Sequence, residues 1–424
     1  MKSGLSFLIA ALRCEIDELD QLARTSALVG TIGRLVHALQ RERGLSNVLL
    51  ASAGRRFAAE RGEQIADGRK FEDIVRAGFE QLEADAHRIG NGARLFSRIA
   101  WVLPGLDALP HLRGRIGQLG MQPADATTAF VKLIAGLLAV VFEAADGATD
   151  PEISRLLVAM FNFMQGKEFA GQERACGAAA FTSGLNDSAR QQQWLHLIES
   201  QERCFHVFVE FSGPGLAAQW QTNLPPAQTA ELERLRRIAC AAPAGVPLNP
   251  ELSPTWFDCS SRRIDGMQVV EERLAADLRK LCESKIAQAR SELAAHEALL
   301  AQLTAEGRST ATAFFDTPAA DAVPPLNAKA PYGRQLERSI LEMVQEQSQR
   351  LQAMSDELDT VRATLNERKL VERAKGLLMA HRQLSEEEAH KMLRQTAMNQ
   401  NRRVVDVAES VLSMAEYLPR GTST

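Results

Sequence analysis

The sequence predicts an all-α protein, and three observations lead to that prediction. Ala, Leu, Glu, Arg and Gln dominate the 424 residues and aromatic residues make up only 5%, a composition with high helix and low strand propensity. Apolar residues recur at the i, i+3, i+4 and i+7 spacing of a helix in long segments, and no stretch alternates with the period of a strand. These segments include 28–40, 127–144, 153–164, 191–211 and 269–303. Helices with one apolar stripe bury it against each other, so helical bundles are expected.

Proline and glycine divide the chain. Loops are expected at 213–226 and at 241–255, a stretch with four prolines. Residues 307–333 are rich in Pro, Ala and Thr, as interdomain linkers are. The predicted organisation is therefore two helical bundles in 1–306, a linker at 307–333, a coiled-coil helix at 334–365 and a small helical module at 366–424.

The helix after the linker carries apolar residues in alternating steps of three and four, which is the a/d pattern of a coiled coil. The residues on this pattern are Leu336, Ile340, Met343, Leu351, Met354, Leu358, Val361 and Leu365. The pattern favours self-association into a homodimer. A single long helix packed on a neighbouring domain is the alternative.

Several classes of protein are not expected. The six cysteines are scattered, without the spacing of metal ligands, so neither a metal nor another cofactor is predicted. No Ser/His/Asp arrangement or phosphate-binding loop points to an enzyme. The apolar stretch Leu5–Leu12 runs into an acidic amphipathic helix and is not expected to be a signal peptide. The most apolar segment, Leu133–Phe142, is shorter than the ~20 residues of a membrane span. A cytoplasmic protein without membrane contact is expected.

Two segments of the N-terminal region resemble each other. Residues 40–47 read QRERGLSN and residues 172–179 read QERACGAA, so that a Glu-Arg pair recurs 131 residues later. Small residues beside Arg43 and Arg174 leave room for a guanidinium between helices, and a desolvated guanidinium needs a carboxylate or another anion. Its planar, paired donors suit a planar oxyanion. The alternative is that both arginines pair with Glu42, Glu173 or other acids and hold the bundles together.

The segment LQRERGLSNVLLASAG resembles the start of the NIT domain, a nitrate- and nitrite-sensing family. The resemblance extends over about residues 30 to 280 and implies two four-helix bundles that bind the anion between them with arginines. It implies nitrate or nitrite contact by Arg43, by Arg174 and by Arg236, which lies in a basic cluster at 231–237. Ala175 stands where the first motif has Gly44, which makes Arg43 the better-matched residue of the two motifs. From spacing alone, the cluster at 231–237 would be a solvated helix face.

The end of the chain is basic although the whole chain has a net charge of -4. Residues 362–403 hold ten Lys or Arg and five Glu, which is a local charge of +5. A small helical unit with a basic face fits a phosphate backbone, and a merely solvated face is the alternative. The candidates for RNA contact are Lys369, Arg373, Lys375, Arg382, Lys391, Arg394, Arg402 and Arg403.

The sequence ERAKGLLMAHRQLSEEEAHKMLRQTAM is similar to the ANTAR domain, an RNA-binding output module. The matching positions are Ala374, Lys375, Gly376, Met379, Ala389, Leu393, Arg394, Ala397 and Met398. The resemblance covers about residues 362–417 and implies a three-helix bundle that binds leader-RNA hairpins. The apolar members of the motif are expected in its core.

Taken together, the two resemblances imply a regulator that prevents transcription termination when nitrate or nitrite occupies the sensor. The anion would free the C-terminal module to bind a leader-RNA hairpin. A regulator whose N-terminal domain senses a protein partner or a different small ligand is the alternative. A receiver domain is not expected, because the front half lacks alternating strands and helices.

Overall fold

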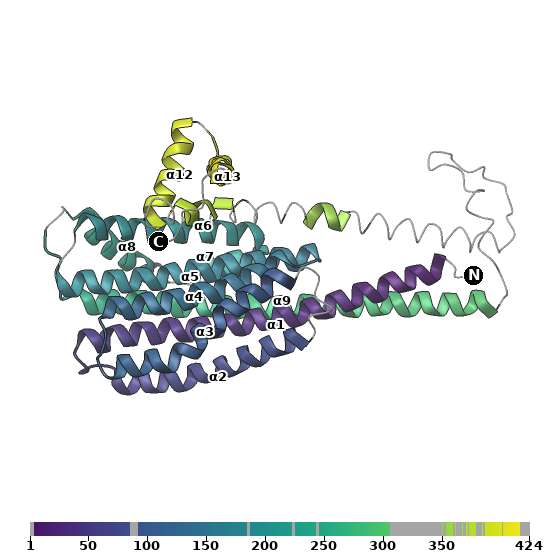
Figure 1. The fold of residues 1–424 in the computed structure, drawn as a ribbon, viewed down its shortest axis with the longest axis horizontal. Coiled ribbons are helices and arrows are strands. Elements are labelled where there is room, and N and C mark those ends of the chain that lie inside the picture. The colour runs from purple at the N-terminus through teal and green to yellow at the C-terminus, as the bar shows by residue number, and fades with distance from the viewer. Residues whose placement is uncertain are drawn as a thin grey trace, which may run out of the picture.

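In the structure, a computed structural model, the described residues form helices joined by short loops and contain no strand (Figure 1). Those residues are 4–84, 92–184, 187–222, 225–242, 246–305, 350, 353–358, 361, 367, 370–371, 373–378, 384, 386–400 and 402–415. The all-α class that composition and periodicity predict is confirmed. The predicted linker at 307–333 lies outside the described residues.

The first four helices close a four-helix bundle. α1 packs against α2 and α4, and α3 packs against the same two helices. Their bounds are Gly4–Ala51 for α1, Ala58–Ala84 for α2, Gly92–Gly117 for α3 and Pro123–Asp146 for α4. Proline at the first position of α4 presets a helical φ and lacks an N–H that would have no partner there.

A second bundle follows in the same order. α5 and α8 each pack against α6 and α9, and the short α7 packs against α6 and α9. The bounds are Pro151–Ser183 for α5, Ser188–Phe211 for α6, Pro214–Thr222 for α7, Pro226–Ala241 for α8 and Leu252–Ala305 for α9. The Asp150 side chain caps α5 by accepting the Ile153 N–H at 3.0 Å, and Gly184 ends the helix in a left-handed conformation with φ of 67°.

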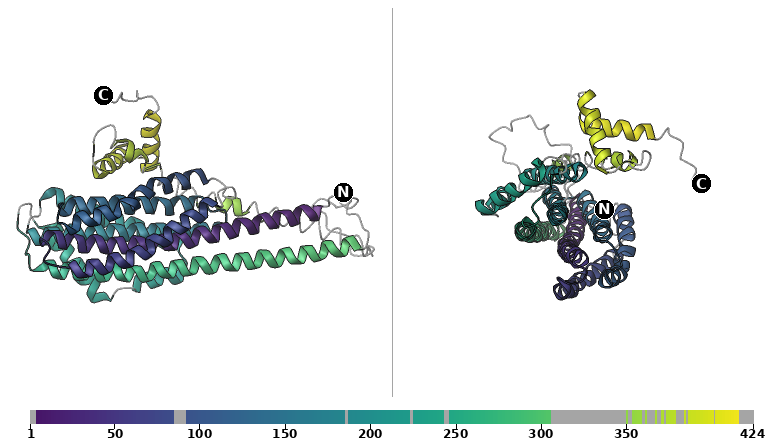
Figure 2. Two further views of the ribbon diagram at one scale, coloured as in Figure 1. Left: turned by 60° about the horizontal axis from the view of Figure 1, so that its bottom comes forward. Right: turned by 90° about the vertical axis from the view of Figure 1, so that its left-hand side faces the viewer.

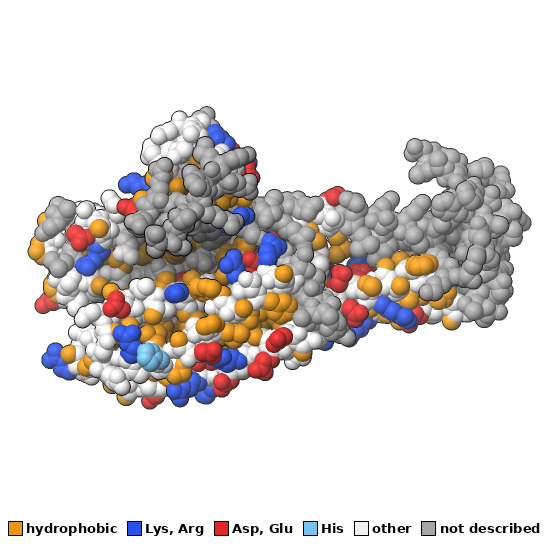
Figure 3. All heavy atoms as spheres, in the orientation of Figure 1, with side chains coloured by type: hydrophobic (Ala, Val, Ile, Leu, Met, Phe, Trp, Pro, Cys, Tyr) orange, Lys and Arg blue, Asp and Glu red, His pale blue; other side chains and the backbone are white. Residues whose placement is uncertain are grey.

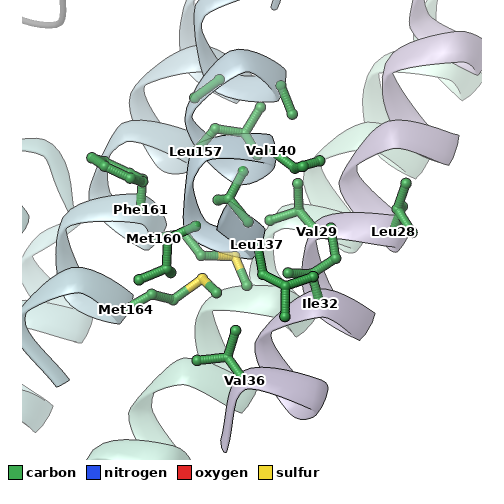
Figure 4. Packing of buried hydrophobic residues seen from close by; sticks show 14 of the residues in the cluster. Leu28, Val29, Ile32, Val36, Leu137, Val140, Leu157, Met160, Phe161 and Met164 are labelled. Atoms are coloured by element: carbon green, nitrogen blue, oxygen red, sulfur yellow. The ribbon is translucent and has the colours of Figure 1, made fainter. Parts of the chain in front are cut away.

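The two bundles share one hydrophobic core. α1 contacts α5 and α9, and α4 contacts α5. Val29 and Ile32 of α1 meet Leu137 of α4 and Met160 of α5 in this core (Figure 4). α1 and α9 also run antiparallel beyond the bundles as a two-helix extension, the long purple and green helices of Figures 1 and 2. This shared core ties the bundles together along the line where α1 meets α5.

α4 is more apolar than the segment Leu133–Phe142 suggests. By length and composition alone it could cross a membrane, with a mean hydropathy of 1.9 over its most apolar 18 residues. The apolar stretch of this helix is therefore longer than Leu133–Phe142 alone. However, 61% of that window is buried inside the protein, and Glu143 and Asp146 at the end of α4 are paired with arginines of α3. α4 is thus a central core helix of the sensor.

The C-terminal module packs α12 (Glu386–Gln400) against α13 (Val404–Ala415) and the helical residues 373–378 (Figure 2). Its core contains the motif residues Ala374, Ala389, Leu393 and Ala397, together with Leu378, Val407 and Ala408. Met398 departs from the expectation: it is 68% exposed, because it lies on the outer face of α12. The other described apolar motif positions are core residues, as predicted.

Only part of the predicted coiled-coil helix is described, and that part contacts α1 and α9. Arg350 donates to Glu292 of α9 at 3.0 Å and to Glu15 of α1 at 3.4 Å. Val361 is buried and belongs to the core cluster that the two bundles share. These contacts favour the alternative that this helix packs on its neighbouring domain.

Candidate anion site and RNA-binding face

Arg43 and Arg174 are brought together where α1 meets α5. Their residues are 1% and 6% exposed, so both guanidinium groups are removed from bulk water. Each lies across a glycine of the other helix. A Cβ added to Gly171 of α5 would be 2.6 Å from Nη2 of Arg43, and one added to Gly44 of α1 would be 3.0 Å from Nη2 of Arg174. Glycine at these two positions lets the guanidinium groups enter the helix interface.

Arg43 already has a carboxylate partner. Its Nη1 donates to Oε1 of Glu168 at 2.5 Å and its Nη2 donates to Oε2 at 3.2 Å. Gln40 and Gln172 donate to the same carboxylate, each at 2.9 Å. Arg43 therefore does pair with an acid, as the alternative reading of the motif requires, but that acid is Glu168 in the second bundle and not Glu42.

Arg174 is held by neutral groups. Its guanidinium donates to Oγ of Ser261 at 3.0 Å and to the carbonyl of Gln40 at 3.2 Å, and it lies over the ring of Phe257. Within the described parts of the chain, no carboxylate lies within ion-pair distance of it. Burial, followed by the charge of Arg43, lowers the pKa of Arg174 to about 10. A buried cation without a counter-ion is unfavourable, and an anion placed beside it would relieve this cost.

The glutamates of the two Glu-Arg pairs turn the other way, into their own bundles. Glu42 accepts both Nε and Nη2 of Arg113 on α3, which also donates to Glu72 of α2. Sequence reasoning missed Arg113, since a single arginine at the end of an amphipathic helix has no distinctive pattern.

In the second bundle, Arg236 of α8 holds Glu173 with two hydrogen bonds of 2.7 Å. Trp194 and Gln201 donate to the same carboxylate, and Arg263 lies 3.7 Å from it. Burial alone would raise the pKa of Glu173, but Arg236 and Arg263 hold it below its ordinary value. The structure thus places Arg236 in this internal network, apart from the pair of Arg43 and Arg174.

The position equivalent to Glu168 in the first repeat is His37, since both precede the arginine by six residues. Its Nδ1 is buried without a hydrogen-bond partner among the described residues. Burial, followed by the charges of Lys167, Arg41 and Arg174, lowers the pKa of His37 to about 2. His37 is consequently neutral at physiological pH, and Arg174 receives no charge from the position that gives Arg43 its partner.

The arginine seam is defined here as Arg43, Arg174, Gln40, Glu168 and Ser261, and it presents guanidinium donors from both bundles. Two buried guanidinium groups and one carboxylate leave a net charge of one positive unit. Planar N–H donors from both sides of a helix interface match the planar oxygens of nitrate or nitrite. The described residues contain no group of three or more His, Cys, Asp or Glu side chains that could hold a metal ion.

The basic residues of the C-terminal module are distributed unevenly. Arg373, Lys391, Arg394, Arg402 and Arg403 are exposed, whereas Lys375 is only 6% exposed; Lys369 and Arg382 lie outside the described residues. Arg403 is paired with Glu367 and Asp406, and Arg402 donates to the Asp406 carbonyl. On the face drawn in Figure 3, acidic and basic side chains are interspersed along the lower edge, so that edge does not form a purely acidic or purely basic patch.

One predicted RNA-binding residue lies against the sensor. Nη1 of Arg394 on α12 is 3.3 Å from Oε2 of Glu199 on α6. Beside this pair, the ring of His390 meets the ring of His196 with centroids 6.0 Å apart. The contact between α12 and α6 therefore covers part of the face that the sequence assigns to RNA.

Comparisons with known proteins agree with both halves of the structure. The family model described as "Nitrate and nitrite sensing" matches residues 34–279, and the ANTAR domain model matches residues 359–412. A nitrate regulatory protein of Klebsiella oxytoca is 35% identical over 413 residues, which cover 95% of this chain and 93% of that protein. A solved structure of the NasR transcription antiterminator is similar with a TM-score of 0.57 and 31% identity, covering 97% of this chain and 99% of that one. The chain therefore belongs to the family of regulatory proteins that join a nitrate- and nitrite-sensing domain to an ANTAR domain.

Proposed function

We propose that this protein is a nitrate- or nitrite-responsive transcription antiterminator. The observation that carries the proposal is the buried pair of Arg43 and Arg174, of which Arg174 lacks a carboxylate. An anion bound there contacts both bundles at once, because the arginines come from α1 and α5. The protein acts by binding and not by catalysis, in the cytoplasm where a nascent transcript is reached.

Arg236 contributes to the proposed anion site indirectly. It holds Glu173, the residue next to Arg174 on α5, and so orients the turn of helix that presents Arg174. Arg43 and Arg174 contact the anion, and Arg236 positions one of them. This division keeps all three predicted residues in the function but gives them different roles.

The output step is release of the C-terminal module. With Arg394 against Glu199, one RNA-binding candidate is engaged in the docked arrangement, and Lys375 is buried. The exposed ion pair itself is worth only about 0–1 kcal/mol, so docking also depends on the neighbouring packing. Anion binding drives release only if the released state binds the anion more tightly than the docked state. A complete switch, from 1:99 to 99:1, requires a preference of about 10⁴-fold.

The released module binds a leader-RNA hairpin through its exposed Lys and Arg residues, which are Arg373, Lys391, Arg394, Arg402 and Arg403, together with Lys375, Lys369 and Arg382. Domain limits of 1–306, 307–333, 334–365 and 366–424 remain part of this proposal. The homodimer through 334–365 is also kept as a proposal beside the contacts of Arg350 with α1 and α9, and sedimentation of the full chain with and without nitrate tests it.

Calorimetric titration of the full chain with nitrate, nitrite, chloride and sulfate tests the proposed function. Saturable binding of nitrate or nitrite, but not of chloride, supports it. Nitrate should also raise the affinity for a hairpin RNA, and Arg43→Ala should remove both effects. If no anion binds, or if Arg43→Ala responds like the wild type, a protein partner or a different small ligand becomes the better hypothesis for the sensor.

A further inference from the structure

Glu168 is a fixed part of the arginine seam. Its carboxylate receives four hydrogen bonds, two from Arg43 and one each from Gln40 and Gln172, and the residue is 2% exposed. A carboxylate that accepts from a guanidinium and two amides is held in place as the counter-ion of that cation. It therefore contributes one full negative charge to the site, with or without an anion.

The equivalent position in the other repeat contributes no charge. His37 is six residues before Arg43, as Glu168 is six residues before Arg174, and Glu168 contacts the arginine of the other helix. The cations whose charges act on His37 are Lys167, Arg41 and Arg174, in that order. The near-symmetric pair of arginines thus has one carboxylate where full symmetry would give two or none.

The charge balance of the seam follows from this asymmetry. Two guanidinium groups and one carboxylate leave a single positive charge to be neutralised. The outer neighbours Arg41 and Asp265 are exposed and act on Arg174 in opposite senses. A monovalent anion cancels the buried charge, whereas a divalent anion leaves one uncompensated negative charge in a buried site. An uncompensated buried charge costs several kcal/mol.

We propose that Glu168 makes the arginine seam selective for monovalent over divalent oxyanions, and that neutral His37 keeps the second arginine available for the ligand. This inference rests on the proposed function, because it concerns the same site. It explains why a carboxylate is retained in a site for an anion: without it, two bare guanidinium groups would suit sulfate at least as well as nitrate.

The test is calorimetry of the full chain with nitrate and with sulfate, comparing the wild type with Glu168→Gln. The amide keeps the size of the side chain and removes its charge. We expect the wild type to bind nitrate but not sulfate, and Glu168→Gln to acquire sulfate binding, so that the nitrate-over-sulfate preference falls at least about tenfold. Glu272→Gln on α9 is the control, since it removes the same charge from an exposed position and should leave the preference unchanged.

A second variant keeps the inference testable even if Glu168→Gln does not fold. His37→Glu adds a carboxylate at the position equivalent to Glu168, where the charges of Lys167, Arg41 and Arg174 act, and should weaken nitrate binding at least about tenfold, while the charge-neutral His37→Gln should not. The thermal midpoint of His37→Glu should not fall, because these cations gain a counter-ion.

The outcomes separate this inference from the proposed function. If the wild type binds nitrate but folded Glu168→Gln keeps the wild-type preference, or if His37→Glu binds nitrate like the wild type, charge selection by Glu168 is wrong and the nitrate sensor stands. If the wild type binds nitrate and sulfate equally, the inference also fails by itself. If the wild type binds neither anion, both fail.

Discussion

In both halves of the sensor, the glutamate of the Glu-Arg pair turns into its own bundle and the arginine crosses to the other bundle. Glu42 meets Arg113 of the third helix of the first bundle, and Glu173 meets Arg236 on α8 of the second. Arg43 lies across Gly171 of α5, and Arg174 lies across Gly44 of α1. The repeat in the sequence is thus a repeat of structural roles.

The halves differ in what the crossing arginine meets. Arg43 finds the carboxylate of Glu168, while Arg174 finds a serine hydroxyl, a backbone carbonyl and an aromatic ring. One arginine of the repeat is thus paired with a carboxylate inside the protein, and the other is held by neutral groups alone. This difference is the basis of the proposed anion site.

The largest predicted effect is the loss of stability when the arginines that pair with Glu42 and Glu173 are removed. Arg113→Ala leaves Glu42 and Glu72 buried without their shared partner, which should lower the free energy of unfolding by about 3–5 kcal/mol. Arg236→Ala should cost less, because Arg263 remains 3.7 Å from Glu173. Chemical denaturation midpoints measure both. Exposed Arg234, paired only with Glu231, is the control, and an Arg236→Ala loss larger than that of Arg113→Ala would contradict the ranking.

The crossing arginines should separate stability from binding. Both Arg43→Ala and Arg174→Ala should weaken nitrate binding at least about 100-fold, or about 3 kcal/mol, because each removes charged hydrogen bonds to the anion. Only Arg43→Ala should destabilise the anion-free protein, since it leaves Glu168 buried without its arginine. Arg174→Ala should leave that stability unchanged or raise it. Thermal unfolding without nitrate measures the stability of each variant, and calorimetry measures its affinity for nitrate. Equal destabilisation by the two variants would contradict the predicted difference between the two arginines.

Substitution of the two glycines should weaken nitrate binding to different extents, with the larger loss where the glycine lies closer to its arginine. Gly171→Ala places a methyl group 2.6 Å from Nη2 of Arg43 and should weaken nitrate binding about tenfold, in line with the ~1–3 kcal/mol cost of overpacking. Gly44→Ala, at 3.0 Å from Arg174, should have a smaller effect. Because alanine has a higher helix propensity than glycine, a loss of nitrate affinity in these variants cannot be attributed to unfolding of the helix. Titration of both variants tests the order, and a larger loss for Gly44→Ala would reverse it.

The docked C-terminal module should respond to acid. Burial, followed by the charges of Arg203, Lys375, His196 and Arg394, lowers the pKa of His390 to about 4 in the docked arrangement. A free histidine has a pKa near 6.5, so docking binds the neutral form and weakens as pH falls below that value, until it levels off near pH 4. At pH 5.5 the docking equilibrium should be about tenfold weaker than at pH 7.5.

RNA binding without nitrate should therefore increase between pH 7.5 and pH 5.5. His390→Gln cannot take up the proton. For this variant, the ratio of the RNA affinity without nitrate to the RNA affinity with saturating nitrate should not change over that pH range. Parallel pH curves for the wild type and His390→Gln would show that this contact is not linked to the titration of His390.

The local physics of the chain predicts much of the architecture. Helix propensity and apolar spacing depend on residues within a few turns of each other. The all-α class and the apolar stripes of α4 and α5 can therefore be predicted from the sequence. The motif residues Ala374, Ala389 and Leu393 are core residues as expected. Met398 is not, because one residue at the end of a stripe can lie on either side of the boundary between core and solvent.

What the sequence by itself determined is that the chain is helical and that Arg43 and Arg174 occupy equivalent places in a repeat. The loop predicted at 213–226 was wrong over Pro214–Thr222, which forms the short helix α7. Only the tertiary structure decided which acid each arginine meets. Arg43 and Glu168 are 125 residues apart, and Arg236 and Glu173 are 63 apart. Such pairs depend on the angle and register at which two helices cross, and the spacing of residues along one helix contains no record of either. For the same reason, the neutral surroundings of Arg174, on which the proposed anion site depends, emerge only when α1, α5 and α9 are packed together.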